Sequence, residues 1–456
     1  MVRSSIVNLS EIKGAKRFDA GRHHIRFLKL ENNLRKITMV RKLRSLIVEP
    51  VRTGHTPRNR DIYEDDRRIY FIKTDNLREG LIDFENSDFL PARSLSERDY
   101  LKFKDVMVTI SGAHFDIIGR AAIFLSDYPQ SVTNQNIAVI KTDENVLNPF
   151  YLTIFLNSKY GREQLWMLSR QTKQVNLNCR EVEELLIPLF DSYFQQEIET
   201  LATDSFELIK KAKSLYSQAE NLLLEELGLK GFKPKYELSY TSNLSKVFGV
   251  HRIDAEYFQS AYDEVINKIK SYSNGYAHLL DLVDNIKPDF DSTKYPNKIF
   301  DYVELSDIDV SIGIIYSVNE IEGEEAPSRA RRILRKNEII VSSVEGSLEK
   351  VALVNEEYRG SLASTGFFQF RAIKILPEIL LILSKSMVLQ AQLKKECAGT
   401  ILNTVPKNAL KRIIIPNIPP GTQQKITLLV QQSHETRQKA KELLEEAKRK
   451  VEKAIE

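Results

Sequence analysis

The stretch SYFQQEIETLATDSFELIKKAKSLYSQAENLLLEEL, residues 192–227, decides the fold of this chain. From Phe194 onward its apolar and small residues recur at alternating spacings of four and three without a slip. This spacing is typical of a helix that presents one stripe to a partner helix, as in a coiled coil. Ser192 with Gln195 predicts a capping box at the start of the helix, and Gly228 predicts its end.

The C-terminal tail repeats this stretch at a constant offset of 228 residues. Six positions of the stripe are identical in the two copies, including a serine that composition alone does not explain. The partner helix is therefore expected in the same chain. The residues expected to pair the helices are Ile198, Leu201, Ser205, Ala212, Leu215 and Ala219 in the first copy and Ile426, Leu429, Ser433, Ala440, Leu443 and Ala447 in the second.

The repeat also extends upstream of both helices. The dipeptide Ile187-Pro188 recurs as Ile415-Pro416 at the same offset. Short apolar runs bounded by polar residues predict strands in the same order in each half. Strands are expected at 69–74, 105–110, 120–125, 136–142 and 184–190, then at 297–305, 337–343, 351–354, 367–373 and 410–416, with helices at 148–165 and 376–393.

Strands outnumber helices in each globular half, so a mixed α+β fold is expected. We expect two such domains in pseudo-two-fold repeat, separated by two long helices that pair as an antiparallel coiled coil. The predicted segments are an N-terminal arm (1–16), the first domain (17–190), the central helix (191–229), a linker (230–250), the second domain (251–419) and the C-terminal helix (420–456).

Composition limits the class of protein without deciding its partners. The chain has 456 residues and a formal net charge of +4, which neither demands nor excludes nucleic acid. Cys179 and Cys397 are its only cysteines, which favours a reducing cytoplasm and no disulfide framework. Residues 1–18 lack the apolar core of a signal peptide, and the apolar run 375–389 is too short and polar for a membrane span.

Enzyme motifs are weak. The segment 148–151, Asn-Pro-Phe-Tyr, is near the Asn-Pro-Pro-Tyr motif of amino-methyltransferases, but it lacks the second proline and a Gly-rich methyl-donor loop. A helix start is favoured there, which argues against a catalytic DNA methyltransferase. No phosphate loop or His-Glu-x-x-His occurs, His23-His24 has no partner ligands nearby, and no Glu-x-Lys follows Pro288-Asp289 as a nuclease motif requires. No catalytic residue, metal site or cofactor site is predicted.

Polar and basic residues instead gather at strand ends and in loops. Arg, Lys, Asn, Gln, Ser, Thr and His side chains hold phosphates and read base edges. A solvated charged surface is the alternative interpretation. The residues expected to contact DNA are Arg52, Thr53, His55, Thr56, Arg58, Arg60, Lys73, Ser111, His114, Arg120, Asn134, Gln135, Arg331, Arg332, Ser342, Ser343, Ser347 and Lys350.

Over nearly its whole length the chain resembles the specificity (S) subunit of type I restriction–modification enzymes. The arrangement of two globular units alternating with two helical repeats carries the resemblance. The second half departs from the pattern because it lacks a clear Gly-x-Thr-Pro loop. The matching motifs are Gly54-x-Thr56-Pro57, Ser111-Gly112 with Ile118-Gly119-Arg120, Asn134-Gln135, Gln218-Ala219-Glu220-Asn221-Leu222-Leu223, Arg252-x-Asp254-Ala255-Glu256-Tyr257 and Ser364-Thr365-Gly366-Phe367.

The resemblance implies a non-catalytic subunit with two target-recognition domains. Each domain would read one half of a bipartite site on double-stranded DNA, and the paired helices would fix the gap and dock two methyltransferase (M) subunits. Those partners would bring S-adenosylmethionine, flip an adenine out of each half-site and methylate it. Restriction and motor (R) subunits are a further expected partner.

Two other interpretations remain open from the sequence. One is the recognition subunit of a related two-component enzyme, whose partner combines methylation with cleavage. The other is a coiled-coil scaffold that binds no DNA. The scaffold predicts no dependence of binding on DNA sequence or salt, whereas phosphate contacts predict a steep salt dependence.

Overall fold

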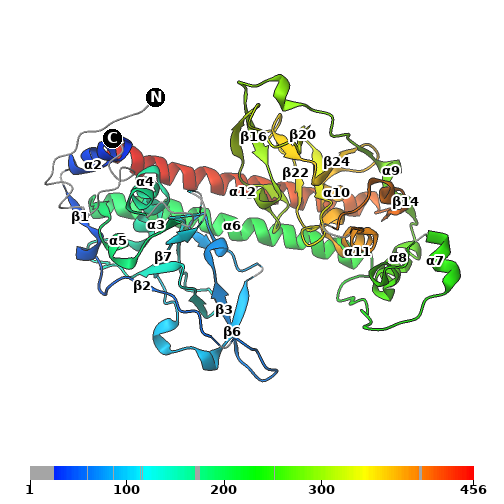
Figure 1. Ribbon diagram of the computed structural model, residues 1–456, viewed down its shortest axis with the longest axis horizontal. Helices are drawn as coiled ribbons and strands as arrows, with labels where there is room; N and C mark the ends of the chain where they lie inside the picture. Colours follow the sequence, from blue (N-terminus) through cyan, green and yellow to red (C-terminus); the bar gives the residue numbers. More distant parts are fainter. Residues whose placement is uncertain are drawn as a thin grey trace. The chain divides into compact units, whose positions relative to one another are not determined.

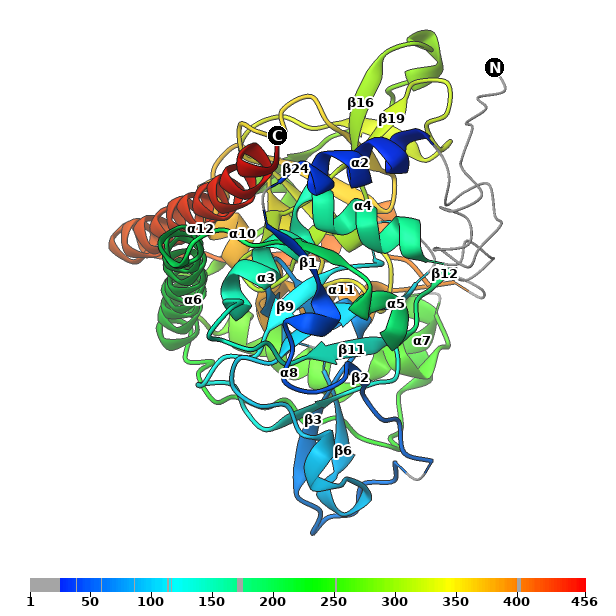
Figure 2. The ribbon, with the colours of Figure 1, turned by 90° about the vertical axis from the view of Figure 1, so that its left-hand side faces the viewer.

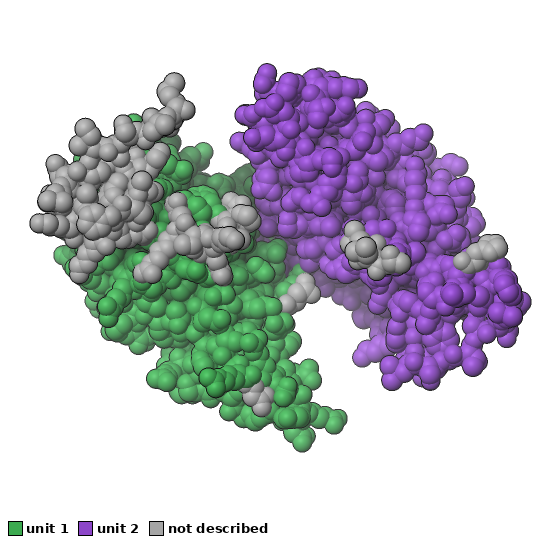
Figure 3. Space-filling model, in the orientation of Figure 1, with its two compact units in different colours: residues 1–208, 438–456 green, residues 209–437 purple. Residues whose placement is uncertain are grey.

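The computed structural model describes residues 25–37, 39–58, 60–85, 87–112, 115, 117–169, 175–250, 252–399 and 403–456. The predicted N-terminal arm lies outside these residues. The chain divides into two compact units, residues 1–208 with 438–456 (unit 1) and residues 209–437 (unit 2) (Figures 1 and 3). Helices α6 (Ser192–Glu226) and α12 (Pro420–Ile455) each contribute one part to unit 1 and the other to unit 2.

Unit 1 is built on a four-stranded antiparallel sheet of order β2-β11-β7-β9 and a three-stranded sheet of order β10-β3-β6. The second sheet contains a parallel pair, β10 with β3. The strands are β2 (Arg52–Thr53), β3 (Arg68–Ile72), β6 (Asp88–Pro91), β7 (Val106–Thr109), β9 (Ala121–Ile123), β10 (Ser131–Thr133) and β11 (Ile137–Ile140), with the two-stranded pairs β1 (Val40–Lys42) and β13 (Leu186–Pro188), β4 (Leu77–Arg78) and β5 (Leu81–Ile82), and β8 (Ser111–Gly112) and β12 (Val175–Asn176).

Both faces of the four-stranded sheet of unit 1 are buried. Val106 and Val108 join the cluster that contains helix α3 (Pro149–Asn157), while Met107 joins a cluster with Ile72 from β3. This alternation follows from the two-residue period of a strand. It explains why the sequence of β7 is apolar throughout, without the alternation expected of a half-exposed strand.

Where one helix was predicted at 148–165, the structure has two. Helix α3 ends at Asn157, and α4 (Lys159–Leu168) begins after Ser158, whose side chain accepts a hydrogen bond from Gly161 N. Ser386 likewise separates α10 (Pro377–Lys385) from α11 (Met387–Glu396) in unit 2. Both single-helix predictions were wrong because a serine competes for backbone N–H groups and starts a new helix.

Unit 2 has a four-stranded antiparallel sheet of order β15-β24-β21-β22 and a mixed sheet of order β19-β16-β23-β20. Its parallel pair is β16 with β23. The strands are β15 (Val283–Asn285), β16 (Ile299–Val303), β19 (Asn319–Glu322), β20 (Ala330–Ile333), β21 (Glu338–Ser342), β22 (Val351–Leu353), β23 (Leu362–Ser364) and β24 (Phe367–Ala372), with the pairs β14 (Tyr276–His278) and β25 (Ile414–Pro416), and β17 (Ile308–Asp309) and β18 (Ile314–Ile315).

The described strands of the two units correspond in order and direction. In unit 1, β3 pairs in parallel with β10, the strand just before β11 in the chain. In unit 2, β16 pairs in parallel with β23, the strand just before β24. Unit 2 adds β20 at the edge of its mixed sheet, where unit 1 has an isolated bridge between Tyr100 and Val132. The remaining described α-helices are α2 (Ile25–Arg35), α5 (Cys179–Glu183), α7 (Leu244–Val250), α8 (Ser260–Lys270) and α9 (Leu279–Leu282). The predicted linker therefore ends in a short helix, α7.

Within unit 1 the first part of α6 lies antiparallel to the last part of α12 (Figure 2). Ser205 Oγ donates to the carbonyl oxygen of Ala440 at 2.7 Å. Eight residues earlier on α6, the carboxylate of Glu197 accepts from Lys450 Nζ at 2.5 Å. Asp191, not Ser192, caps α6, because its side chain accepts a hydrogen bond from Phe194 N at 2.8 Å.

Unit 2 holds the other parts of the two helices in the same manner. Ser433 Oγ donates to the carbonyl oxygen of Ala212 at 2.7 Å, and Thr422 Oγ1 donates to the carboxylate of Glu226 at 2.7 Å. Gly228, at φ +62°, ends α6 as predicted. Its N–H bonds to the carbonyl of Glu225 and the next N–H to that of Leu224, which is the Schellman arrangement.

On both long helices, the stripe of residues that is most deeply buried differs from the predicted pairing stripe at every second position. Ser205, Ala212 and their counterparts are fully buried, but Leu201, Leu215, Leu429 and Leu443 are only partly buried. The buried positions lie one residue later because each helix also packs on the globular part of its unit, which turns its central face. These later positions are Ala202, Ile209, Tyr216 and Leu223 on α6 and Val430, Arg437, Leu444 and Val451 on α12.

Candidate nucleic-acid interface

Three of the predicted DNA-binding segments of unit 1 meet at one edge. The loop after β2 crosses the connection between β10 and β11, where Gly54 N donates to the carbonyl of Ile137 at 3.2 Å. Thr56 Oγ1 donates to the side-chain oxygen of Gln135. Ile110 N donates to Asn136 O at 2.9 Å, which joins the end of β7 to the same connection.

Gly54 makes this crossing possible. A Cβ atom at this position would lie 2.1 Å from the carbonyl oxygen of Thr133, far inside van der Waals contact. The Gly-x-Thr-Pro motif is thus required by a close approach of two backbones. The Thr133 hydroxyl is buried beside it and has no hydrogen-bond partner in the described part of the chain.

Exposed residues of this edge are available to a ligand, whereas others are engaged internally. Thr53, His55, Arg58, Arg60 and Gln135 are exposed. Arg52 is held by the carbonyl of Tyr100 at 3.3 Å and by Asp105 at 3.5 Å. Burial raises the pKa of Asp105, which the adjacent Arg52 opposes.

The remaining predicted residues of unit 1 are less accessible. Lys73 Nζ is paired with Asp88 at 2.8 Å, and Ser111 is buried in the β8–β12 pair. Asn134 is buried, and its side chain accepts from Asn136 N at 3.1 Å, which shapes the turn. Arg120 is half-buried after a turn at Gly119. His114 lies outside the described residues.

Unit 2 builds the corresponding edge with the same backbone bonds. Ser343 N donates to Gly366 O at 2.8 Å, as Ile110 N does to Asn136 O in unit 1. Val405 N donates to Ser343 O at 2.8 Å, as Leu177 N does to Ile110 O. Ser364-Thr365 thus takes the place of Asn134-Gln135.

The predicted serines of this edge are structural in the free chain. Ser342 is fully buried and its hydroxyl lies 3.0 Å from that of Ser347, while Ser343 Oγ donates to Gly366 O at 2.8 Å. Lys350 Nζ lies 3.5 Å from the carbonyl oxygen of Ile308. A DNA contact at Ser342 would require this loop to open, so we do not assign it one.

Two adjacent predicted arginines point in opposite directions. The register between β20 and β23 shifts between Ala330 and Arg332, which leaves Arg331 as the extra residue of a bulge. Arg331 is exposed, but Arg332 is only 5% exposed and points inward. Its Nη1 donates to the carbonyl of Ile286 at 2.7 Å, while its Nε has no hydrogen-bond partner among the residues that the structure describes.

Arg332 lines a cavity of about 430 Å³ at this edge of unit 2. Arg329 and Lys407 also line it, with Ser343, Ser364 and Thr365. Sequence reasoning placed Arg329 in one basic run with Arg331 and Arg332, but it missed Lys407, which lies far along the chain from that run. Alignment of the two halves points to Thr365, because it occupies the place of Gln135.

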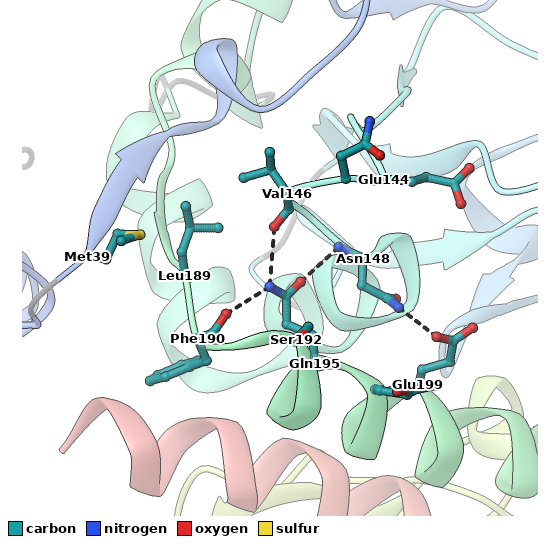
Figure 4. A pocket seen from close by; sticks show the side chains of 11 residues that line it. Met39, Glu144, Val146, Asn148, Leu189, Phe190, Ser192, Gln195 and Glu199 are labelled. Atoms are coloured by element: carbon teal, nitrogen blue, oxygen red, sulfur yellow. Dashed lines mark hydrogen bonds between the residues drawn. The ribbon is translucent and has the colours of Figure 1, made fainter.

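A second cavity, of about 420 Å³, lies in unit 1 where α6 begins (Figure 4). Gln195 Nε2 donates to the carbonyls of Phe190 and Val146 at 2.9 and 3.3 Å, and its Oε1 accepts from Asn148 N at 2.8 Å. Asn148 Nδ2 donates to Glu199 at 2.6 Å. Because these polar groups satisfy one another, the cavity is a junction that fixes α6 to α3. Asn148 also caps α3, as the helix-start interpretation of the Asn-Pro-Phe-Tyr segment predicted.

The Arg-x-Asp-Ala-Glu-Tyr motif of unit 2 is an anchor. Arg252 donates to the carbonyl of Cys397 at 2.7 Å, pairs with Asp254 at 2.5 Å and lies 4.4 Å from the centre of the Tyr257 ring. These contacts hold the segment on the end of α11. Within the described residues, no group of His, Cys, Asp and Glu is arranged to hold a metal, and no helix is long and apolar enough to cross a membrane.

No protein-family model and no curated protein matches the chain. Among solved structures it is similar to the S subunit of a type I restriction–modification system from M. genitalium, with a TM-score of 0.41 and 13% identity over 92% of this chain and 95% of that one. The HsdS subunit from Thermoanaerobacter tengcongensis gives a TM-score of 0.31 and 13% identity, covering 91% and 96%. A structure concerned with complex assembly and conformational transition of the type I R-M system gives 0.31 and 12%, with the same coverage.

Proposed function

We propose that this chain is the DNA sequence-recognition subunit of a type I restriction–modification complex. Units 1 and 2 each read one half of a bipartite site. The observation that carries the proposal is the duplicated architecture: two α+β units with corresponding strand orders, each followed along the chain by a helix of 35 or 36 residues. Two copies of a DNA-binding domain are the simplest use of such a repeat, because the grooves of DNA repeat along its axis.

The edge of unit 1 supplies side chains suited to this task. Arg58 and Arg60 are exposed cations for phosphates, and Thr53, His55 and Gln135 are exposed donors and acceptors for base edges. Gly54 and the Thr56–Gln135 hydrogen bond hold the loop in place. A loop that is rigid before binding loses less conformational entropy when it docks.

The long helices act as a spacer in this proposal. A helix of 35 residues spans about 50 Å, compared with about 34 Å between successive major grooves. The antiparallel contacts of α6 with α12 in each unit support full-length pairing as a coiled coil. Paired helices would hold the two half-sites at a fixed separation, and their exposed faces would dock two methyltransferase subunits.

The chain itself contributes no catalytic group in this proposal. The methyltransferase partners bring S-adenosylmethionine and extrude the target adenine, because a base inside the duplex is out of reach of an active site. Restriction and motor subunits join the same assembly. A related two-component enzyme, in which one partner both methylates and cleaves, would use the chain in the same way.

The proposal is tested by selecting duplexes that the purified full chain binds from a random-sequence library. We expect two short conserved blocks at a fixed spacing. For the selected duplex, the logarithm of the binding constant should fall linearly with log salt, by about 0.9 for each phosphate neutralised.

Arg58→Ala with Arg60→Ala should lower that slope, and Lys374→Ala, at an exposed lysine outside the predicted interface, should leave it unchanged. Binding that is independent of both sequence and salt would favour the scaffold interpretation and overturn the proposal.

A further inference from the structure

Arg332 is a buried cation without a counter-ion. Its pKa is lowered to about 10 by burial, and no ion pair of Arg332 occurs within the described part of the chain. A buried charge is normally neutralised by a partner, because the loss of hydration is otherwise uncompensated. The free chain therefore carries an unfavourable group that the fold nevertheless retains.

Other arginines of the molecule are paired with a carboxylate. Arg371, on β24 of the other four-stranded sheet of unit 2, lies 2.9 Å from the buried carboxylate of Glu338. Arg52 of unit 1 has Asp105 at 3.5 Å. Among the described residues no carboxylate is paired with Arg332, which lines the cavity, and its Nε has no acceptor there.

The residues that line this cavity favour an occupant with negative charge. Arg329, Arg332 and Lys407 line it, and no aspartate or glutamate is among its lining residues. Arg329 is paired with Glu304 at 3.1 Å, so Arg332 and Lys407 are the cations that an anion would meet. Hydroxyl groups of Ser364 and Thr365 add polar contacts suited to oxygen atoms. An Arg guanidinium matches the geometry of phosphate oxygens and is weakly hydrated, which favours its use at buried phosphate sites.

We propose that this cavity of unit 2 binds a phosphate group through Arg332 and that, in the DNA-bound chain, this group belongs to the DNA backbone. The second half of this inference rests on the proposed function; the first does not. The cavity lies beside Ser343 and Gly366, the counterparts of the residues that form the polar edge of unit 1. It supplies a phosphate contact to the half that lacks the Gly-x-Thr-Pro loop, and the alternation of β20 directs Arg332 inward while Arg331 is exposed.

Thermal unfolding of the full chain in sodium phosphate and in sodium chloride at equal ionic strength tests the first half. We expect phosphate to raise the Tm of the wild type but not of Arg332→Met. In chloride, Arg332→Met should unfold at or above the wild-type Tm, since a buried unpaired charge has been removed. Arg359→Met, which removes an exposed arginine paired with Glu356, should retain the phosphate effect.

Asn285→Asp provides a second variant that keeps Arg332. Asn285 lines the same cavity, so the new carboxylate would supply the missing counter-ion and should abolish the phosphate effect. A wild-type Tm that does not distinguish phosphate from chloride would overturn the site, as would an undiminished phosphate effect in Arg332→Met.

The source of the phosphate is tested with the selected duplex. Arg332→Met should lower the salt slope of DNA binding by about 0.9, the value for one phosphate, and Arg359→Met should not. An unchanged slope together with an Arg332-dependent phosphate effect would overturn the DNA assignment and indicate a free phosphate compound. If the wild type binds no DNA but keeps that phosphate effect, the proposed function fails while the anion site stands.

Discussion

The Ser205 hydroxyl donates a 2.7 Å hydrogen bond to the carbonyl oxygen of Ala440, and both residues are fully buried. The reciprocal bond runs from Ser433 to Ala212, also at 2.7 Å. Adding 228 to Ser205 and Ala212 gives Ser433 and Ala440, so the repeat in the sequence is also a repeat of this contact. Each bond fixes the register of α6 against α12 within one unit.

These serine bonds should contribute measurably to stability. Ser205→Ala and Ser433→Ala should each lower the free energy of unfolding by about 1 kcal/mol, the typical worth of a hydrogen bond. Ser205→Leu should cost more, about 1–3 kcal/mol, since the seam has no room for it. Thr200→Ala is the control, because its hydroxyl bonds only to its own helix at an exposed site. Denaturant titration measures all four, and a neutral Ser205→Leu would contradict close packing of the helices.

Gly54→Ala should disrupt the polar edge of unit 1. The new Cβ would meet the Thr133 carbonyl, so the loop must move away from the β10–β11 connection. We expect a loss of about 1–3 kcal/mol and weaker DNA binding. Gly249→Ala, in helix α7, where no atom lies within 4 Å of the added Cβ, should lower neither the stability nor the DNA affinity. Unaltered affinity in Gly54→Ala would show that the loop position does not matter to the ligand.

His434 should make unit 2 sensitive to mild acid. Its Nε2 donates to the carbonyl of Ile312 at 2.8 Å, and burial lowers its pKa below 6.5, helped by Lys385 and opposed by Ile312 O, Glu378 and Asp309. The unfolded chain then binds more protons than the folded one as pH falls below about 6.5, so stability is full above that pH and declines below it. His434→Gln keeps a donor and cannot titrate. Urea unfolding at pH 7.5 and 5.5 should show a smaller difference for this variant than for the wild type; equal differences would contradict the assignment.

The exposed lysines of the long helices are our candidates for the methyltransferase contact. Lys211 and Lys439 occupy equivalent positions of the repeat, and both are exposed. Lys211→Glu with Lys439→Glu should weaken co-purification with a methyltransferase, whereas Lys374→Glu should not. If the double variant still assembles fully and folds normally, the partner binds a different face.

Much of the fold follows from local patterns in the sequence. The repeat, the long helices, the end of α6 at Gly228 and the order of the main strands all depend on short-range spacing. The errors have tertiary causes. Asp191 caps α6 in place of Ser192, and the central stripe is shifted at Leu201 and Leu215 because α6 packs on two surfaces at once.

The candidate site was less predictable than the fold. Sequence reasoning placed Gly54, Thr56 and Gln135 in one site, and the structure brings them together. It also treated Arg331 and Arg332 as equivalent, although successive residues of a strand face opposite sides, which leaves Arg331 exposed and Arg332 buried. Burial of Ser342 likewise depends on how the following turn folds back onto it.

The most direct test of the account is to co-express the full chain with the methyltransferase encoded beside it and to map methylated adenines across the host genome by long-read sequencing. The account predicts one split motif, with two short blocks separated by a constant gap and one methylated adenine in each. A short continuous motif, or a stable complex that methylates no defined sequence, would contradict the central claim that two units held by paired helices read two half-sites.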